Sequence, residues 1–170
     1  SHELERPDDS SLIEFGYSMV PAHYQPKSGS SPIINYPYAR AKEVLYSLKS
    51  HERADAWNGH MLKYINPVTG DWALPRLATC MRLMPAGFAS KPYRSTESTV
   101  FTIVEGSGVS RIGDSEFSWG EKDIFVAPSW VLQEHQSHQD SIIFSYSDRA
   151  AQEKLGLFRE VRQEATTDGV

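Results

Sequence analysis

Residues 99–128 read TVFTIVEGSGVSRIGDSEFSWGEKDIFVAP. Short runs of β-branched and aromatic residues alternate in this stretch with glycine-containing separators, a pattern typical of short strands joined by turns. The pattern continues on both sides of the stretch, and many short strands at this spacing favour a β-sandwich or a β-barrel. The fold class is therefore predicted to be all-β. Strands are expected at residues 77–83, 99–105, 109–112, 116–119, 124–127 and 141–146.

The separator at residues 105–108, Glu-Gly-Ser-Gly, determines how two of these strands are connected. Nucleotide-binding loops are also rich in glycine, but here a strand follows the separator, so no helix N-terminus is available to bind phosphate. The prediction is a tight hairpin between the two flanking strands.

The N-terminal third has a different character. Residues 1–35 contain four prolines and the run Ser-Gly-Ser-Ser, which predicts an arm with one strand. That strand is suggested by the alternation of Ile13, Phe15, Tyr17 and Met19. Residues 38–51 have apolar side chains at helical spacing and predict an amphipathic helix packed on the barrel.

The tail from residue 148 predicts a short closing helix followed by a polar end. The expected organisation is an N-terminal arm and linker helix (1–57), a β-barrel (58–162) and a flexible tail (163–170).

The composition excludes several kinds of partner. The 170 residues, 39% of them hydrophobic, suffice for one domain. The net charge is −5 and the basic residues are scattered, which argues against nucleic acid. Apolar stretches fall short of the roughly 18 to 20 residues of a membrane span, and no signal-peptide pattern is present, so we expect a cytoplasmic protein without a membrane partner. Cys80, the single cysteine, is expected to be a buried strand residue.

Residues 85–113 and 120–135 have the layout of the two sequence motifs of a cupin barrel. Eight further stretches are informative: Tyr36-Pro37-Tyr38-Ala39-Arg40, Asn66-Pro67-Val68-Thr69-Gly70, Ala73-Leu74-Pro75, Lys91-Pro92-Tyr93-Arg94-Ser95-Thr96, Val104-Glu105-Gly106-Ser107-Gly108, Pro128-Ser129-Trp130, Ser145-Tyr146-Ser147-Asp148-Arg149 and Gln152-Glu153-Lys154-Leu155-Gly156-Leu157. These stretches are similar to the C-terminal half of gentisate 1,2-dioxygenases, and the resemblance covers nearly the whole chain. It implies a jelly-roll (double-stranded β-helix) barrel with one or two flanking helices.

Members of this family are bicupins, with two cupin domains in one polypeptide and several polypeptides in an oligomer. The resemblance implies Fe(II) in the N-terminal cupin, where gentisate and O2 meet on the metal and the ring opens to maleylpyruvate. The His-Arg-His-Thr string of that cupin does not occur in this sequence. The implied partners are therefore an N-terminal cupin half in the same polypeptide, further copies of the polypeptide and an aromatic acid. Gentisate, salicylate and 1-hydroxy-2-naphthoate are not distinguished, because the residues that read the substrate are expected in the N-terminal half.

The cupin motif also indicates where metal ligands would lie. It places two histidines one residue apart on a strand, so that both point inward, and a third a few residues after a proline. Here these positions hold Tyr93, Ser95 and Gln133, which are poor ligands for ferrous iron. We therefore expect neither a metal nor a catalytic residue in this chain. His135 matches a histidine proposed to move protons in the family's catalytic half, a role that lapses without iron.

A barrel without metal still has an interior, whose polar groups need partners. The candidate pocket consists of Tyr93, Arg94, Ser95, Gln133 and His135, with Arg94 placed to bind a carboxylate.

Two other functions are alternatives: an autonomous cupin that binds an aromatic acid, and a small cupin enzyme with unusual metal ligands. Against the second, a strand would direct His135 and His138 to opposite faces, and residues 136–137 indicate a turn. A catalytic triad of Ser137, His138 and Asp140 is disfavoured, because triads are assembled from distant segments.

Overall fold

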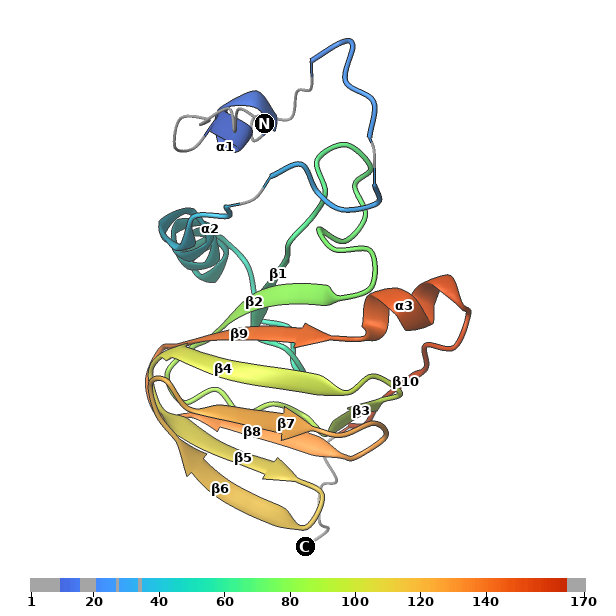
Figure 1. Cartoon of the computed structure of the whole chain (residues 1–170). Helices are drawn as coiled ribbons and strands as arrows, with labels where there is room; N and C mark the ends of the chain where they lie inside the picture. The colour runs from blue at the N-terminus through green and yellow to red at the C-terminus, as the bar shows by residue number, and fades with distance from the viewer. Residues whose placement is uncertain (1–9, 16–20, 27, 34, 165–170) are drawn as a thin grey trace, which may run out of the picture.

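The computed structural model describes residues 10–15, 21–26, 28–33 and 35–164 (Figure 1). In these ranges ten strands form two five-stranded antiparallel sheets, the two walls of a jelly-roll barrel. The predicted all-β cupin fold is confirmed. The first sheet has the order β1 (His60–Lys63), β2 (Ala78–Met84), β9 (Ser141–Ser147), β4 (Thr99–Glu105), β7 (Ile124–Ala127). The second has the order β10 (Glu160–Arg162), β3 (Tyr93–Ser95), β8 (Gln133–Ser137), β5 (Gly108–Ile112), β6 (Ser115–Trp119).

The alternation of side chains along each strand decides what lies inside the barrel. The polarity of the inward side chains changes from one end of the barrel to the other. On β9 they run from Ser147 and Ser145 to the apolar Ile143, and on β2 they run from Cys80 and Arg82 to Met84. Because these strands are paired in register, one end of the interior is apolar and the other is polar.

The apolar end is the core of the barrel. Its buried side chains come from both sheets and exclude water from that end. They are Met84, Phe101, Ile103, Ile112, Trp119, Ala127 and Ile143.

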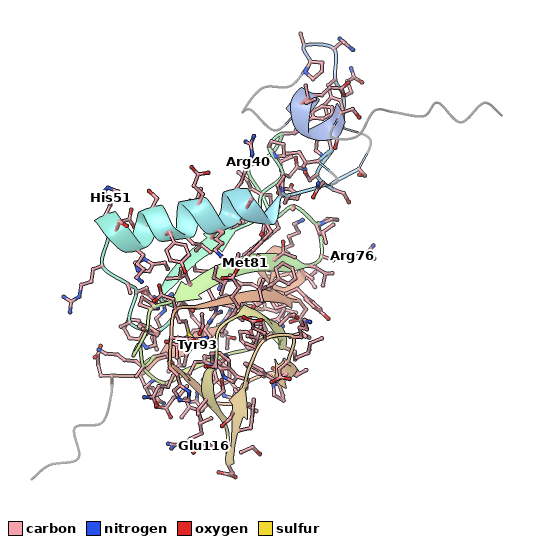
Figure 2. The ribbon with its side chains drawn as sticks, turned by 90° about the vertical axis from the view of Figure 1, so that its left-hand side faces the viewer. Arg40, His51, Arg76, Met81, Tyr93 and Glu116 are labelled. Carbon is pink, nitrogen blue, oxygen red and sulfur yellow. The ribbon has the colours of Figure 1, made fainter. Side chains whose placement is uncertain are left out.

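Helix α2 (Tyr38–His51) confirms the predicted amphipathic helix and covers the outer face of β1 and β2. Its residue Leu45 is fully buried in a second cluster with Met81, Leu83 and Ile142. Figure 2 shows Met81 on the side of β2 that faces this helix. The Nζ of Lys42 lies 2.7 Å from Oε1 of Glu105 and ties the helix to the end of β4.

The predicted hairpin at residues 105–108 is wrong. Strand β4 pairs with β7 and β9, whereas β5 pairs with β6 and β8, so Gly106 and Ser107 carry the chain from one sheet to the other. Gly106 has a φ of +97°, and a Cβ there would overlap Ser141. The glycine is required for a close crossing between sheets, which local sequence does not distinguish from a hairpin turn.

The predicted strand in the arm is also wrong where it is described. Residues 10–15 form helix α1 (Ser10–Phe15), while Tyr17 and Met19 lie outside the described residues. No described strand pairs with this segment, and a helix satisfies its own backbone hydrogen bonds where a lone strand cannot.

Two predictions near the C-terminus have different outcomes. The turn at residues 136–137 is wrong, because both residues belong to β8. The closing helix is confirmed as α3 (Arg149–Lys154), which follows β9 directly (Figure 1). Of the predicted tail, residues 163–164 are described, and the N–H of Gln163 donates to the carbonyl of Pro92. No helix in the described ranges is long and apolar enough to cross a bilayer.

Candidate functional site

A cavity of about 330 Å³ occupies the polar end of the barrel. It is lined by β1, β2, β4 and β9 of the first sheet, by β3, β8 and β10 of the second, and by α3. Tyr93, Gln133 and His135, three of the five pocket residues predicted from the sequence, line it. Tyr93 and Gln133 are brought together because they are direct cross-strand partners of β3 and β8.

The other two predicted residues do not line the cavity. Ser95 is buried beside it, and its hydroxyl donates to Glu97 at 3.2 Å. Arg94 alternates with Tyr93 and Ser95 along β3 and so points to the opposite face. Its guanidinium lies 4.8 Å from the ring centre of Trp130, so a carboxylate inside the cavity would meet other cations.

His135 is held in a chain of buried hydrogen bonds. Oε1 of Gln133 can only accept, so Nε2 of His135 donates to it at 3.1 Å. The other ring nitrogen, Nδ1, then accepts from the hydroxyl of Ser110 at 2.7 Å. The indole N–H of Trp119 donates to the same hydroxyl oxygen at 2.8 Å. Both imidazole nitrogens are therefore occupied by protein groups.

The surroundings of His135 also fix its charge. Burial, followed by the positive charge of Arg82, lowers the pKa of His135 to about 3. The imidazole is thus neutral near pH 7 and is suited to the hydrogen bonds described above, not to proton transfer.

Tyr93 keeps its proton as well. Its hydroxyl donates to Oε2 of Glu160 at 3.0 Å. Burial, together with the negative charges of Glu97 and Glu160, raises the pKa of the Tyr93 phenol. A protonated phenol is not a metal ligand. The hydroxyl of Tyr93 instead links β3 to Glu160 of β10.

Ferrous iron does not fit this set of side chains. The ligand positions hold a protonated phenol, a hydroxyl that donates to Glu97, and an amide that accepts from His135. The lone pair of His135 that a metal would need is taken by Ser110. Within the described residues no group of three or more His, Cys, Asp or Glu side chains is placed to hold a metal ion.

The alternative triad is not assembled either. The hydroxyl of Ser137 donates to the carbonyl of Pro85 at 2.5 Å, and Asp140 forms an ion pair with Lys49 of α2. His138 is exposed beyond the end of β8, whereas His135 is buried, in agreement with the opposite faces predicted for them.

Sequence reasoning missed all seven charged residues that line the cavity, which are Lys63, Arg82, Glu97, Arg149, Glu153, Glu160 and Arg162. A signal for Arg82 was available. It occupies an inward position of a predicted strand, next to the otherwise apolar Met81 and Leu83, where a charge is rarely found without a reason. Cys80 is buried on the same strand, as predicted.

The depressed pKa of His135 predicts an acid-sensitive fold. The unfolded chain binds a proton near the ordinary value of 6.5 that the folded chain does not bind until about 3, so the stability contributed by neutral His135 is complete above 6.5 and is lost as the pH falls through this window. Between about pH 7 and about pH 5, the wild type is expected to lose about 2 kcal/mol of unfolding free energy relative to His135→Gln.

Urea unfolding of both proteins at the two pH values measures this difference. Other titrating groups are common to both proteins and cancel. Identical pH dependences would show that His135 is not neutral and buried in the folded chain.

The chain is similar to several known proteins. It is 46% identical over 160 residues to gentisate 1,2-dioxygenase 1 of Aquipseudomonas alcaligenes, a match that covers 94% of this chain and 46% of that protein. It is 28% identical over 157 residues to 5-aminosalicylate 1,2-dioxygenase of a Comamonas species, covering 91% of this chain and 42% of that protein. No family model matches the sequence.

Among solved structures, salicylate 1,2-dioxygenase from Pseudoaminobacter salicylatoxidans, as an adduct with gentisate, superposes with a TM-score of 0.83 at 24% identity. That superposition covers 91% of this chain and 44% of the other, and at this identity it bears on the fold. The chain therefore spans about half the length of the relatives it matches.

Proposed function

Because this chain belongs to the gentisate 1,2-dioxygenase family, we propose that it is the metal-free, C-terminal cupin half of a cytoplasmic enzyme that opens the ring of gentisate to maleylpyruvate with O2. In this proposal Fe(II) is bound by the N-terminal cupin half of the same polypeptide, and the half described here supports and assembles the enzyme. Gentisate is the favoured substrate because the 46% identical relative is a gentisate 1,2-dioxygenase.

One observation carries the metal-free assignment. The residue that comes nearest to being a metal ligand, His135, has both ring nitrogens engaged by Ser110 and Gln133. A metal ion could bind only by displacing a buried hydrogen bond and leaving its partner unsatisfied, which costs about 1–3 kcal/mol for each group. The hydrogen bonds around His135 therefore favour a structural role for this histidine.

The support and assembly role is based on apolar surface outside the barrel. A groove of about 550 Å³ lies on the outer face of the first sheet, lined by Ile33, Leu74, Val104 and Phe144 among others. Further along that sheet, Ile124 and Val126 of β7 are exposed. Contiguous apolar surface of this kind marks an interface. Since the relatives are about twice as long as this chain, the other half of the polypeptide is the occupant we propose.

Metal analysis tests the proposal. The purified chain, incubated anaerobically with ferrous iron and then desalted, is expected to retain far less than one iron per chain and to show no O2 uptake with gentisate. The Aquipseudomonas alcaligenes relative, treated in the same way, is the positive control. One tightly bound iron per chain together with ring opening would overturn the proposal.

A variant separates this half from the metal site in the intact two-cupin protein. Tyr93→Phe removes the hydroxyl at a ligand position but keeps the ring, and it is expected to leave iron content and turnover unchanged. Loss of iron from this variant would show that the cavity of this half is a metal site.

A further inference from the structure

Arg82 is a buried cation without a partner. Its residue is 9% exposed, it points into the cavity from β2, and its Nε is a buried donor with no hydrogen-bond partner. No ion pair within the described residues includes it. The guanidinium lies over the ring of Phe101, whose centre is 5.1 Å from the guanidinium carbon.

Such an arrangement is unfavourable unless something binds to the guanidinium. A buried charge is normally paired and hydrogen-bonded, and an unpaired one costs several kcal/mol. A structural role would be served better by an apolar residue of similar size, since Met84 on the same face of β2 and Ile143, the cross-strand partner of Arg82, belong to the apolar core. The guanidinium of Arg82 therefore fits a role in binding an anionic ligand better than a role in stabilising the barrel.

The other arginines of the cavity are already paired. Nε of Arg149 lies 2.7 Å from Oε1 of Glu153, and Nε of Arg162 lies 3.3 Å from Oε1 of Glu160. Glu97 accepts hydrogen bonds from the hydroxyls of Ser95 and Ser147. Arg82 is thus the cation that these carboxylates leave free to bind an anion.

The charges that line the cavity set the charge of that anion. Lys63, Arg149 and Arg162 each have a carboxylate within 4.0 Å, so Arg82 is the one unpaired cation among the described cavity residues, while His135 is neutral. A single negative charge matches that one cation, and a dianion such as phosphate would exceed it. A monocarboxylate also matches the planar fork of a guanidinium.

The remaining lining favours a ring attached to the carboxylate. Phe101, Tyr93 and Trp57 present aromatic surface to the cavity. Ser145, buried on β9 and paired with Phe101 across the strands, has a hydroxyl with no hydrogen bond to another described residue. A volume of about 330 Å³ lies at the lower limit for small-molecule pockets, so the ligand must be small.

We propose that the barrel cavity binds a small carboxylate that carries a ring, with the carboxylate on the guanidinium of Arg82 and the ring against Phe101, Tyr93 and Trp57. This proposal goes beyond the support role above, since a purely supporting half needs no ligand. The site is independent of iron and lies in the half that we propose to be metal-free.

Benzoate is the probe, and thermal unfolding with calorimetric titration is the readout, using the whole chain without added metal. Benzoate at millimolar concentrations is expected to raise the melting temperature of the wild type. Arg82→Met, which keeps the volume but removes the charge, is expected to bind benzoate roughly tenfold or more weakly. The same variant should melt no lower than the wild type, because it loses an unpaired buried charge.

Arg111→Met is the matched control, because Arg111 is exposed on β5 outside the cavity and should leave benzoate binding unchanged. Two further ligands test the chemistry: benzyl alcohol, which lacks the charge, and inorganic phosphate, which lacks the ring, should both fail to stabilise the wild type. The proposal is overturned if benzoate gives neither heat nor a shift in melting temperature, if Arg82→Met binds it equally well, or if phosphate binds as tightly. A large drop in the melting temperature of Arg82→Met would instead assign Arg82 a structural role.

Discussion

Replacing Phe101 by alanine is expected to lower the free energy of unfolding by about 3–5 kcal/mol, the range for removal of a fully buried phenylalanine. The ring lies where the apolar core meets the polar cavity. It stacks on Phe125 with centres 5.0 Å apart and contacts the edge of His135 at 5.2 Å. Its loss would open the core to the cavity and remove the aromatic surface beneath Arg82.

Chemical denaturation of Phe101→Ala measures this effect, and Val100→Ala is the control. Val100 is the preceding residue of the same strand but lies on the outer face and is half-buried, so its truncation is expected to cost about 1 kcal/mol. Similar costs for the two variants would mean that the inward and outward faces of β4 are assigned wrongly.

The second large effect is expected for Gly108→Ala, which should cost about 3 kcal/mol or prevent folding. Gly108 lies on β5, paired with Ser137 of β8 and Trp119 of β6. A Cβ at this position would overlap the backbone carbonyl oxygen of Gln136 and the ring of Trp119. Relief requires a shift of β8, which would disturb the hydrogen bonds around His135.

Gly120→Ala is a matched control for this substitution. A Cβ at Gly120 meets no atom within 4 Å and the residue has an ordinary φ, so its replacement should change stability by no more than about 0.5 kcal/mol. The two proteins can be compared by their yield of folded material and their urea midpoints. Equal stability of both variants would contradict the close packing of β5 against β6 and β8.

Strands with an apolar inward face were predictable from the sequence, because short runs of β-branched and aromatic residues are typical of strands with a buried face. Strand β4, with its Thr-Val-Phe-Thr-Ile-Val run, is the clearest case. Strand β8 reads Gln-Glu-His-Gln-Ser and has no apolar residue, since its inward side chains face the polar end of the barrel. Its strand character comes from pairing with β5, which is not visible in a local pattern.

The site was predictable only in part for a similar reason. The cupin motif located Tyr93, Ser95 and Gln133, because their positions are defined by strand and turn spacing. Arg82 lines the cavity from β2, a strand outside both motifs. Its proposed role follows from the lack of an ion-pair partner among the described residues, which the sequence does not reveal. The neutral state of His135 likewise depends on Ser110, which lies 25 residues away in sequence. Contacts between distant segments of this kind follow from the fold and not from spacing.

The position of β9 in the first sheet has a consequence for how the chain folds. This strand lies between β2 and β4, yet it is made after every strand of the barrel except β10. Until residues 141–147 have been synthesised, β2 and β4 each expose an unpaired edge. The first sheet is then incomplete, so neither the apolar core nor the polar cavity can be enclosed. Pairing over such long sequence separations is slow. The barrel is therefore expected to close as a late, cooperative step, with its open edges vulnerable to aggregation until then.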